Sequence, residues 1–234
     1  MPAYHEDPSI FPMEGGCSCG LLRYRIAQAP IVIHCCHCTA CQRETGTAFA
    51  INAIIESTSL EQLAPAPPTV PAGPHGEPPE APAGPHLRYT ARQPASAPDD
   101  DDLLVCPADI RRPEDAAEPT HVTIPSESGR GQSVARCPGC GTCVWTHYAG
   151  AGSYMAFIKV GTLDQAWRLD PDVHIYTRSK RGFVAVDDGA QRYEAFYPDY
   201  RDVYRPEAIE RFEKLLPEIR AYRESAAERA AKGS

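Results

Sequence analysis

Residues 31–46, with the sequence IVIHCCHCTACQRETG, decide the expected fold because they concentrate side chains that can bind a metal ion. Three thiols fall within six positions as Cys36-x-Cys38-x-x-Cys41, and Zn²⁺ prefers thiolate and imidazole ligands at such short spacings. A closed structural zinc site has four protein ligands, whereas a catalytic zinc keeps three and one open position. The cluster therefore predicts an open Cys₃ zinc site.

Two further cysteine pairs lie far apart in the chain. Cys17-x-Cys19 is flanked by glycines, which permit a tight turn. Cys137-Pro-x-Cys140-Gly is a zinc knuckle, in which the proline sets the turn and the glycine takes a positive φ. We expect these two pairs to form a closed Cys₄ zinc site that contributes folding energy and leaves no room for a substrate. Cys143 is a ligand only in an alternative register, and a buried position beside Trp145 is the favoured interpretation.

Composition excludes several classes of protein. The chain has 234 residues, 42% of them hydrophobic, and a formal net charge of -8. An acidic chain without a basic cluster is a poor nucleic-acid binder, and no apolar run is long enough for a membrane span. The N-terminal residues lack the features of a secretory signal, so we expect a cytoplasmic protein, with a nuclear location left open. In that compartment ten cysteines favour metal over disulfides.

Alternating and β-branched segments predict a mainly β domain with little helix before residue 205. A short helical turn is expected to end at Gly46. The expected strands are Leu21–Ile26, Ile31–Ile33, Phe49–Ile55, Tyr154–Val160, Val173–Tyr176 and Phe183–Val186, with strand fragments at 103–105 and 121–124.

Three segments stand apart from the expected zinc domain at 15–204. Residues 1–14 are interpreted as a tail or an edge segment, with the tail preferred. Residues 61–102 hold eleven prolines between Pro65 and Pro98 and end in an acidic run, so we expect a solvated insertion loop rather than an adaptor ligand, with residues 87–89 as a candidate short strand inside it. Residues 205–234 predict a helical extension that starts at Pro206, is kinked or broken at Pro217 and frays after Tyr222.

Several side chains keep open roles. His37 lies between two expected zinc ligands and is a fourth ligand, an acid–base group or a structural residue. His34 and Cys35 carry the same alternatives. For His174 a structural role is favoured over a role at the site, and for the isolated Cys106 a buried position is favoured. Arg43 and Lys159 are candidates for contacts with a substrate anion, with solvation at the surface as the default.

The motifs together resemble one known family. Gly16-Cys17-x-Cys19-Gly20, Arg23-Tyr24, Cys36-His37-Cys38-x-x-Cys41, Cys137-Pro-x-Cys140-Gly141, Gly161-Thr162-Leu163-Asp164 and Val173-His174-Ile175 follow the order of the glutathione-dependent formaldehyde-activating enzyme family, also called the centromere protein V domain family. The resemblance implies a β-tent-like fold of several short antiparallel sheets. It also implies two zinc ions: a structural one on Cys17, Cys19, Cys137 and Cys140, and a catalytic one on Cys36, Cys38 and Cys41.

The resemblance further implies a carbon–sulfur lyase that joins glutathione and formaldehyde into S-hydroxymethylglutathione. Three thiolates make zinc a weak Lewis acid, so thiol chemistry is more natural at this site than hydrolysis. Two alternatives stay open: a related zinc enzyme that acts on another small electrophile, in which the long insertion forms one wall of the site, and a non-catalytic zinc module for protein partners. The oligomeric state is not predicted.

Overall fold

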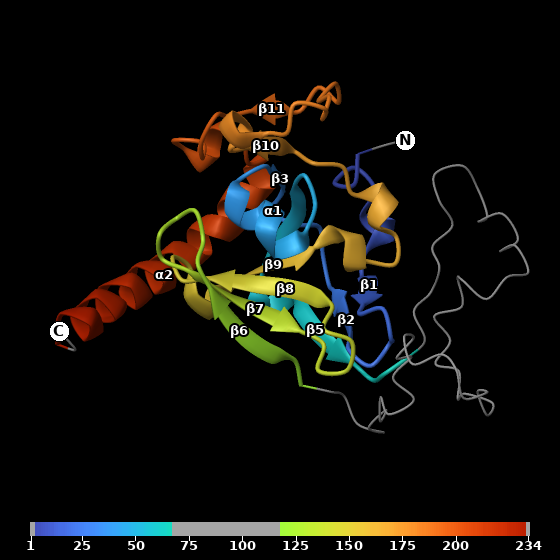
Figure 1. Cartoon of the computed structure of the whole chain (residues 1–234), viewed down its shortest axis with the longest axis horizontal. Coiled ribbons are helices and arrows are strands. Elements are labelled where there is room, and N and C mark those ends of the chain that lie inside the picture. Colours follow the sequence, from blue (N-terminus) through green and yellow to red (C-terminus); the bar gives the residue numbers. More distant parts are fainter. Residues whose placement is uncertain (1–2, 67–117, 233–234) are drawn as a thin grey trace, which may run out of the picture.

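The computed structural model describes residues 3–66 and 118–232. Its strands form two sheets, one with the order β1-β2-β5 and one with the order β11-β10-β3-β4-β9-β8-β7-β6 (Figure 1). The strands are Met13–Gly16 (β1), Arg23–Ile26 (β2), Val32–Cys36 (β3), Ala50–Glu56 (β4), Leu60–Leu63 (β5), Thr120–Ile124 (β6), Gln132–Arg136 (β7), Cys143–Tyr148 (β8), Met155–Lys159 (β9), Val173–Ile175 (β10) and Gln191–Arg192 (β11). The α-helices are Thr39–Thr45 (α1) and Pro206–Lys232 (α2).

Short 3-10 helices lie in the connections: Pro8–Ile10, Ser57–Ser59, Gly152–Tyr154, Val160–Thr162, Ala166–Arg168, Thr177–Ser179 and Tyr200–Asp202. The mainly β prediction is confirmed. Most strand pairs are antiparallel, as expected, and the larger sheet is mixed because β10 pairs in parallel with both β3 and β11.

The central strands β3, β4 and β9 of the larger sheet are buried on both faces, which explains their apolar sequences, whereas β6 and β11 at its edges are exposed. Side chains alternate along a strand, so Ile33 and Ile55 face a core shared with β2 of the small sheet, whereas Val32 and Ile54 face a second core. This second core also contains Cys36 and residues of α1 and α2. The open cysteine cluster thus lies on the helical face of the sheet.

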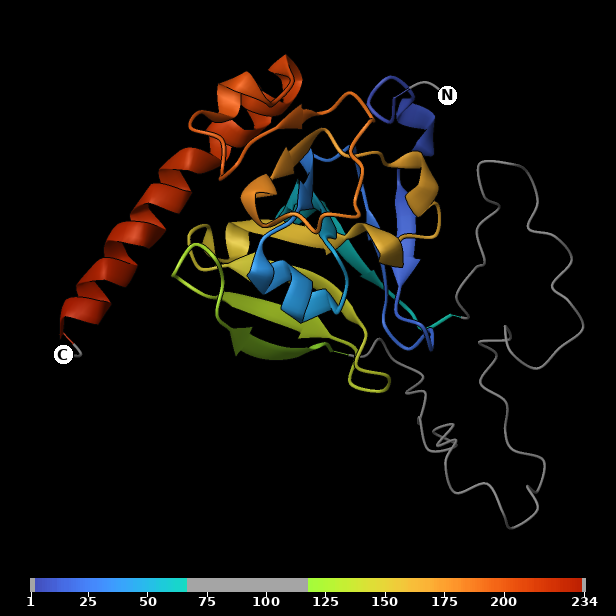
Figure 2. The same cartoon turned by 45° about the horizontal axis from the view of Figure 1, so that its top comes forward.

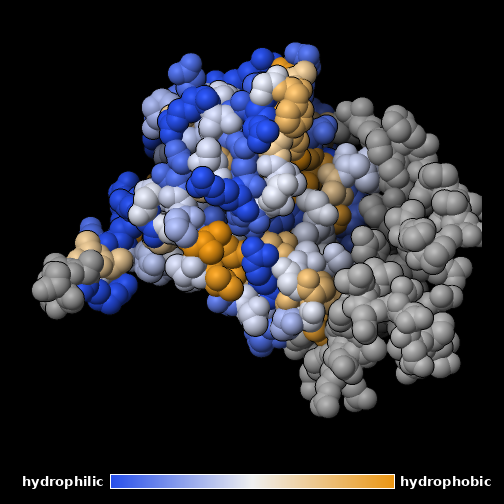
Figure 3. Space-filling view, viewed as in Figure 1, coloured by the Kyte–Doolittle hydropathy of each residue, from blue (hydrophilic) through white to orange (hydrophobic). Residues whose placement is uncertain are grey.

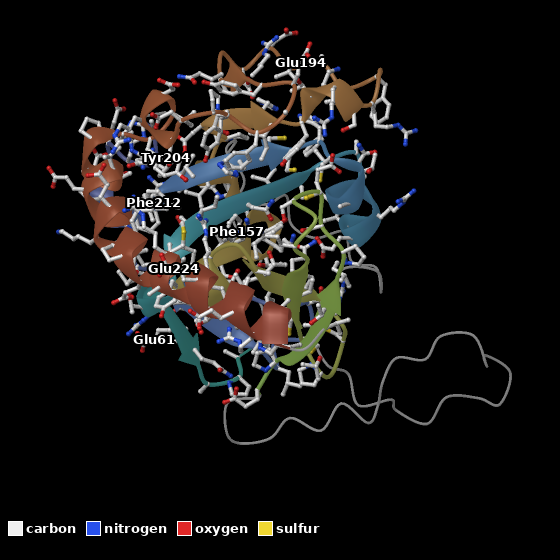
Figure 4. The ribbon with its side chains drawn as sticks, turned by 90° about the vertical axis from the view of Figure 1, so that its left-hand side faces the viewer. Glu61, Phe157, Glu194, Tyr204, Phe212 and Glu224 are labelled. Carbon is white, nitrogen blue, oxygen red and sulfur yellow. The ribbon has the colours of Figure 1, made fainter. Side chains whose placement is uncertain are left out.

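Helix α2 packs on that second core and then extends past the sheets, as two views show (Figures 1 and 2). Its residue Phe212 lies next to Tyr204, with ring centroids 5.4 Å apart (Figure 4). The helix is not broken at Pro217, which is exposed, so that water can hydrate the carbonyl that proline leaves unbonded. The predicted fraying after Tyr222 is also wrong, since the Ala-rich end has high helix propensity and stays helical to Lys232.

Two other predictions need correction. Residues 3–14 are an edge segment rather than the preferred tail: Tyr4 and Ile10 are about 5% exposed or less, and β1 is an edge strand of the small sheet. Phe183–Val186 forms no strand, because Phe183 is 78% exposed and β11 occupies the sheet edge instead.

The Pro-rich insertion begins later than predicted, because residues 61–63 belong to β5, which pairs with β2. The expected strands at 87–89 and 103–105 and the thiol of Cys106 lie outside the described residues. The molecular face in Figure 3 is mostly hydrophilic with small hydrophobic patches. Within the described ranges, the structure contains no helix whose length and apolar character would let it cross a membrane.

Candidate metal centres

Four cysteines from two distant turns meet as the sequence predicts. The sulfurs of Cys17, Cys19, Cys137 and Cys140 all lie within 4.8 Å of one another. The Sγ atom of Cys19 is 3.5 Å from that of Cys17 and 3.7 Å from that of Cys137. A tetrahedral zinc with Zn–S bonds of about 2.3 Å places its sulfurs about 3.8 Å apart, so this cluster fits a closed Cys₄ zinc site.

The local backbone explains why each turn presents its sulfurs together. The amide of Leu22 donates to Cys17 Sγ at 3.3 Å, and the amide of Gly139 donates to Cys137 Sγ at 3.4 Å. Gly141 has a φ of 73°, in the left-handed region that closes the second turn. The cluster therefore joins the β1–β2 turn to the β7–β8 turn.

The second cluster lies where β3 passes into α1. The sulfurs of Cys36, Cys38 and Cys41 lie within 4.8 Å of one another, and all three residues are at most 5% exposed. Cys38 caps the helix, since its Sγ accepts a hydrogen bond of 3.3 Å from the amide of Cys41. Gly46 ends the helix with a φ of 68°, as predicted. Three converging sulfurs fit a metal ion that keeps one position open.

The charge of this cluster also favours a cation. Hydrogen bonds from Cys36 and Cys41 lower the pKa of Cys38 to about 3, and the same contact with Cys38 raises the pKa of Cys36. These shared hydrogen bonds favour the ionised form at Cys38 and the neutral thiol at Cys36. Zn²⁺ deprotonates coordinating thiols outright, so all three cysteines can be ionised when the metal is bound.

A tyrosine approaches the cluster from β8. The hydroxyl of Tyr148 lies 3.9 Å from Cys41 Sγ. Burial and the neighbouring thiols raise the pKa of Tyr148 well above its usual value. This hydroxyl consequently keeps its proton at neutral pH and can donate it in a hydrogen bond.

An ion-pair network lies between the two cysteine clusters. Glu44 of α1 has a side chain that is 1% exposed, and its carboxylate is 2.7 Å from the Nζ atom of Lys159. Arg136, which precedes the knuckle cysteine Cys137, lies 3.7 Å from the same carboxylate. Lys159 is thus buried and paired, so the interpretation as a solvated surface cation is wrong.

We expect Glu44→Gln to lower the free energy of unfolding by about 3 kcal/mol, because it leaves the Lys159 ammonium buried without its partner charge. The matched control is Glu61→Gln, which breaks an exposed pair with Arg25 and should cost less than about 1 kcal/mol. Urea unfolding of both variants measures the difference. Equal losses in the two variants would contradict the importance of the buried pair.

A groove of about 530 Å³ runs along the helix that carries Cys38 and Cys41. Its lining includes Arg43 of α1 and Arg181 from the loop after β10. The exposed ring of Phe183 forms another part of the wall. The groove therefore offers two cations and an aromatic surface on a chain whose net charge is -8. This location agrees with the prediction that Arg43 contacts an anion, which stays a prediction.

The other candidate site residues do not belong to the Cys₃ cluster. His37 Nε2 lies near Cys35 and His174 rather than with the three sulfurs, so the structure does not support His37 as a fourth ligand of that cluster. His34 hydrogen-bonds the Tyr197 hydroxyl at 2.9 Å. Cys143 belongs to none of the metal-binding groups among the described residues, and its Sγ is 4.0 Å from the Trp145 carbonyl oxygen, although the residue is only half-buried.

The comparison with known families agrees with this geometry. The family model described as glutathione-dependent formaldehyde-activating enzyme matches residues 12–72 and 111–179, which hold all seven cysteines of the two clusters. The chain belongs to this family. No match was found among curated proteins. The resemblance read from the motifs is therefore confirmed, and membership implies an enzyme of glutathione-dependent formaldehyde activation.

Sequence reasoning missed the residues that surround the two clusters. Tyr148 was not singled out from the sequence, and Arg181 lies just before the segment 183–186 that was expected to form a strand. Tyr148 approaches Cys41 of the open cluster, and Arg181 lines the groove along α1. Both positions depend on contacts between residues that are distant in the sequence. His174 was known as a motif residue, but its partners become visible only through the pairing of β10 with β3.

Proposed function

We propose that this protein is a zinc-dependent carbon–sulfur lyase that acts on the adduct of glutathione and formaldehyde, S-hydroxymethylglutathione. In this proposal Cys36, Cys38 and Cys41 hold the catalytic zinc, and Cys17, Cys19, Cys137 and Cys140 hold the structural zinc. The observation that carries it is the convergence of three buried sulfurs beside a cationic groove. A zinc ion in the open site would supply the positive charge that keeps an incoming thiol ionised at neutral pH.

The chain's own residues supply the other requirements of the reaction. In the forming direction the glutathione thiol loses its proton to the buffer, its sulfur attacks the aldehyde carbon, a C–S bond forms, and the carbonyl π bond breaks. The resulting oxygen anion takes up one proton from the buffer, so that no net proton is gained or lost. The Tyr148 hydroxyl lies 3.9 Å from Cys41 Sγ and serves as the hydrogen-bond donor to that oxygen. Buried walls around the sulfurs exclude bulk water.

The groove accounts for selection of glutathione over a simple thiol. Glutathione carries two carboxylates, and Arg43 and Arg181 provide two guanidinium groups beside α1. The groove and the cluster share one element, because Arg43 belongs to α1, which is capped by Cys38 and carries Cys41 in its first turn.

The direct test follows the adduct by proton NMR with glutathione and formaldehyde, and with a panel of other thiols and aldehydes. We expect acceleration that depends on bound zinc, with glutathione and formaldehyde as the best pair. Rate enhancement with a different aldehyde alone would replace formaldehyde as the substrate. No acceleration with any pair would refute the lyase proposal.

Arg181→Gln is expected to raise the KM for glutathione about tenfold with little change in kcat, since it removes one charged contact to a carboxylate. The KM for 2-mercaptoethanol, which has no carboxylate, should not change. Arg192→Gln in β11 removes a charge outside the groove and serves as the control. A similar KM change for both thiols would argue against carboxylate binding by Arg181.

A further inference from the structure

A third group of side chains that could bind a metal ion lies across the sheet from the Cys₃ cluster and takes no part in the proposed reaction. Cys35, His37 and His174 present one ligand atom each within 4.8 Å of one another, and all three are at most 5% exposed. The Nε2 atom of His37 is 2.9 Å from His174 Nδ1 and 3.6 Å from Cys35 Sγ. The three donors thus surround one point.

Strand geometry explains how two clusters occupy one short segment. Successive side chains of a strand point to opposite faces, so Cys35 of β3 leaves the sheet on the face opposite to Cys36. The parallel pairing of β10 with β3 places His174 directly opposite Cys35. His37, the residue after the strand, turns to the Cys35 side while Cys38 turns to α1.

Both close contacts of His37 Nε2 depend on a single proton at that nitrogen. His174 Nε2 lies 2.7 Å from the Asp188 carboxylate, which accepts its proton and leaves Nδ1 of His174 as a lone pair. When the His174 ring is neutral, His37 Nε2 donates to that lone pair. With its only Nε2 proton so used, His37 has no acceptor at that nitrogen for the thiol of Cys35. One cation would satisfy all three donor atoms at once.

We propose that Cys35, His37 and His174 bind a divalent metal ion of their own, of the borderline class to which Zn²⁺ belongs, independently of the two cysteine-only clusters. One thiolate and two neutral imidazoles are typical ligands for this class. Asp188 orients the His174 ring from outside, in the carboxylate–histidine–metal arrangement. One thiolate and a dication leave a charge of +1, which the adjacent Asp188 carboxylate balances.

The observed spacing is close to that of a tetrahedral site. Bonds of about 2.3 Å to sulfur and about 2.0 Å to nitrogen give an S···N separation of about 3.5 Å and an N···N separation of about 3.3 Å. The sulfur distance agrees, and the two imidazoles need to separate by a few tenths of an ångström. On binding, the Cys35 thiol proton passes to the buffer and the His37 proton moves from Nε2 to Nδ1, so the charges balance.

The test measures zinc per chain on the full-length protein after equilibration in a zinc buffer. Cys35→Ser and His174→Gln should each remove one equivalent relative to the wild type, and the double variant should remove no more, because both residues share one ion. Adding Cys38→Ser should remove a further equivalent. His121→Gln, an exposed histidine on β6, is the matched control and should keep the full content.

Unchanged zinc content in folded Cys35→Ser and His174→Gln would overturn the proposal and leave the group as a hydrogen-bonded cluster. If those variants fail to fold, Asp188→Asn decides, since this carboxylate is 40% exposed and is not itself a ligand. The Asp188→Asn variant should bind one of its zinc ions about 10- to 100-fold more weakly than the wild type does. A zinc affinity of Asp188→Asn equal to that of the wild type would also overturn the proposal. This result is independent of lyase activity.

Discussion

Cys38→Ser is expected to abolish thiol-dependent turnover while the protein stays folded. Cys38 caps α1 and is one of the three sulfurs of the open cluster. Serine keeps an oxygen that can cap the helix but is a poor zinc ligand, so the metal of this cluster should be lost. The expected decrease in kcat/KM is at least about 10³-fold, measured by NMR detection of the adduct together with zinc analysis.

The control for this prediction is Tyr148→Phe, which removes a proton donor but no sulfur ligand. It should retain all of its zinc and reduce kcat by about 10²- to 10⁴-fold, the range typical of a lost acid or oxyanion donor. Full activity in Cys38→Ser would disprove a role of the cluster in catalysis. Normal kcat in Tyr148→Phe would remove only the proposed role of that hydroxyl.

Cys137→Ser is expected to prevent stable folding. Its thiol belongs to the cluster that joins the β1–β2 turn to the β7–β8 turn, and the residue is 1% exposed. Structural zinc contributes about 10–16 kcal/mol in small zinc-finger peptides, while whole domains have a net stability of only about 5–15 kcal/mol. Loss of even a third of the zinc contribution would therefore remove much of the stability. Circular dichroism during thermal unfolding measures the change.

Cys143→Ser is the matched control, because it removes a half-buried thiol in the same turn region that belongs to neither cysteine cluster. Its melting temperature should change by only a few degrees. A strong chelator added to the wild type should reproduce the effect of Cys137→Ser. Thermal stability of Cys137→Ser equal to that of Cys143→Ser would show that the knuckle does not hold a structural metal.

Local features were predictable because short-range chemistry determines them. The spacing of Cys36, Cys38 and Cys41 brings three sulfurs together at one strand–helix junction, and Gly46 ends the helix where its positive φ is needed. The knuckle at Cys137 likewise depends on its own proline and glycine. The alternation of apolar residues predicted β2, β4, β9 and β10 to within one or two positions at each end, and β3 was predicted three positions too short at its end. The strands β7 and β8 on either side of the knuckle were not predicted.

Features that depend on distant partners were not predictable in the same way. The N-terminal segment packs against the domain because the Tyr4 hydroxyl contacts Asp172 and Arg205, both far away in the chain. Phe183 carries an apolar pattern, but Gln191 and Arg192 pair with β10 in its place. A single sequence contains no direct information about such competition for a sheet edge.

By itself the sequence determined which side chains can bind metal and that the domain is mainly β, because ligand type and side-chain periodicity are local properties. The tertiary structure decided how those side chains are divided. It placed Cys35, His37 and His174 together on one side of the sheet and the three-sulfur cluster on the other, and it buried Lys159 against Glu44. The physical reason is strand pairing: only the register between β3 and β10 specifies which distant residue meets Cys35.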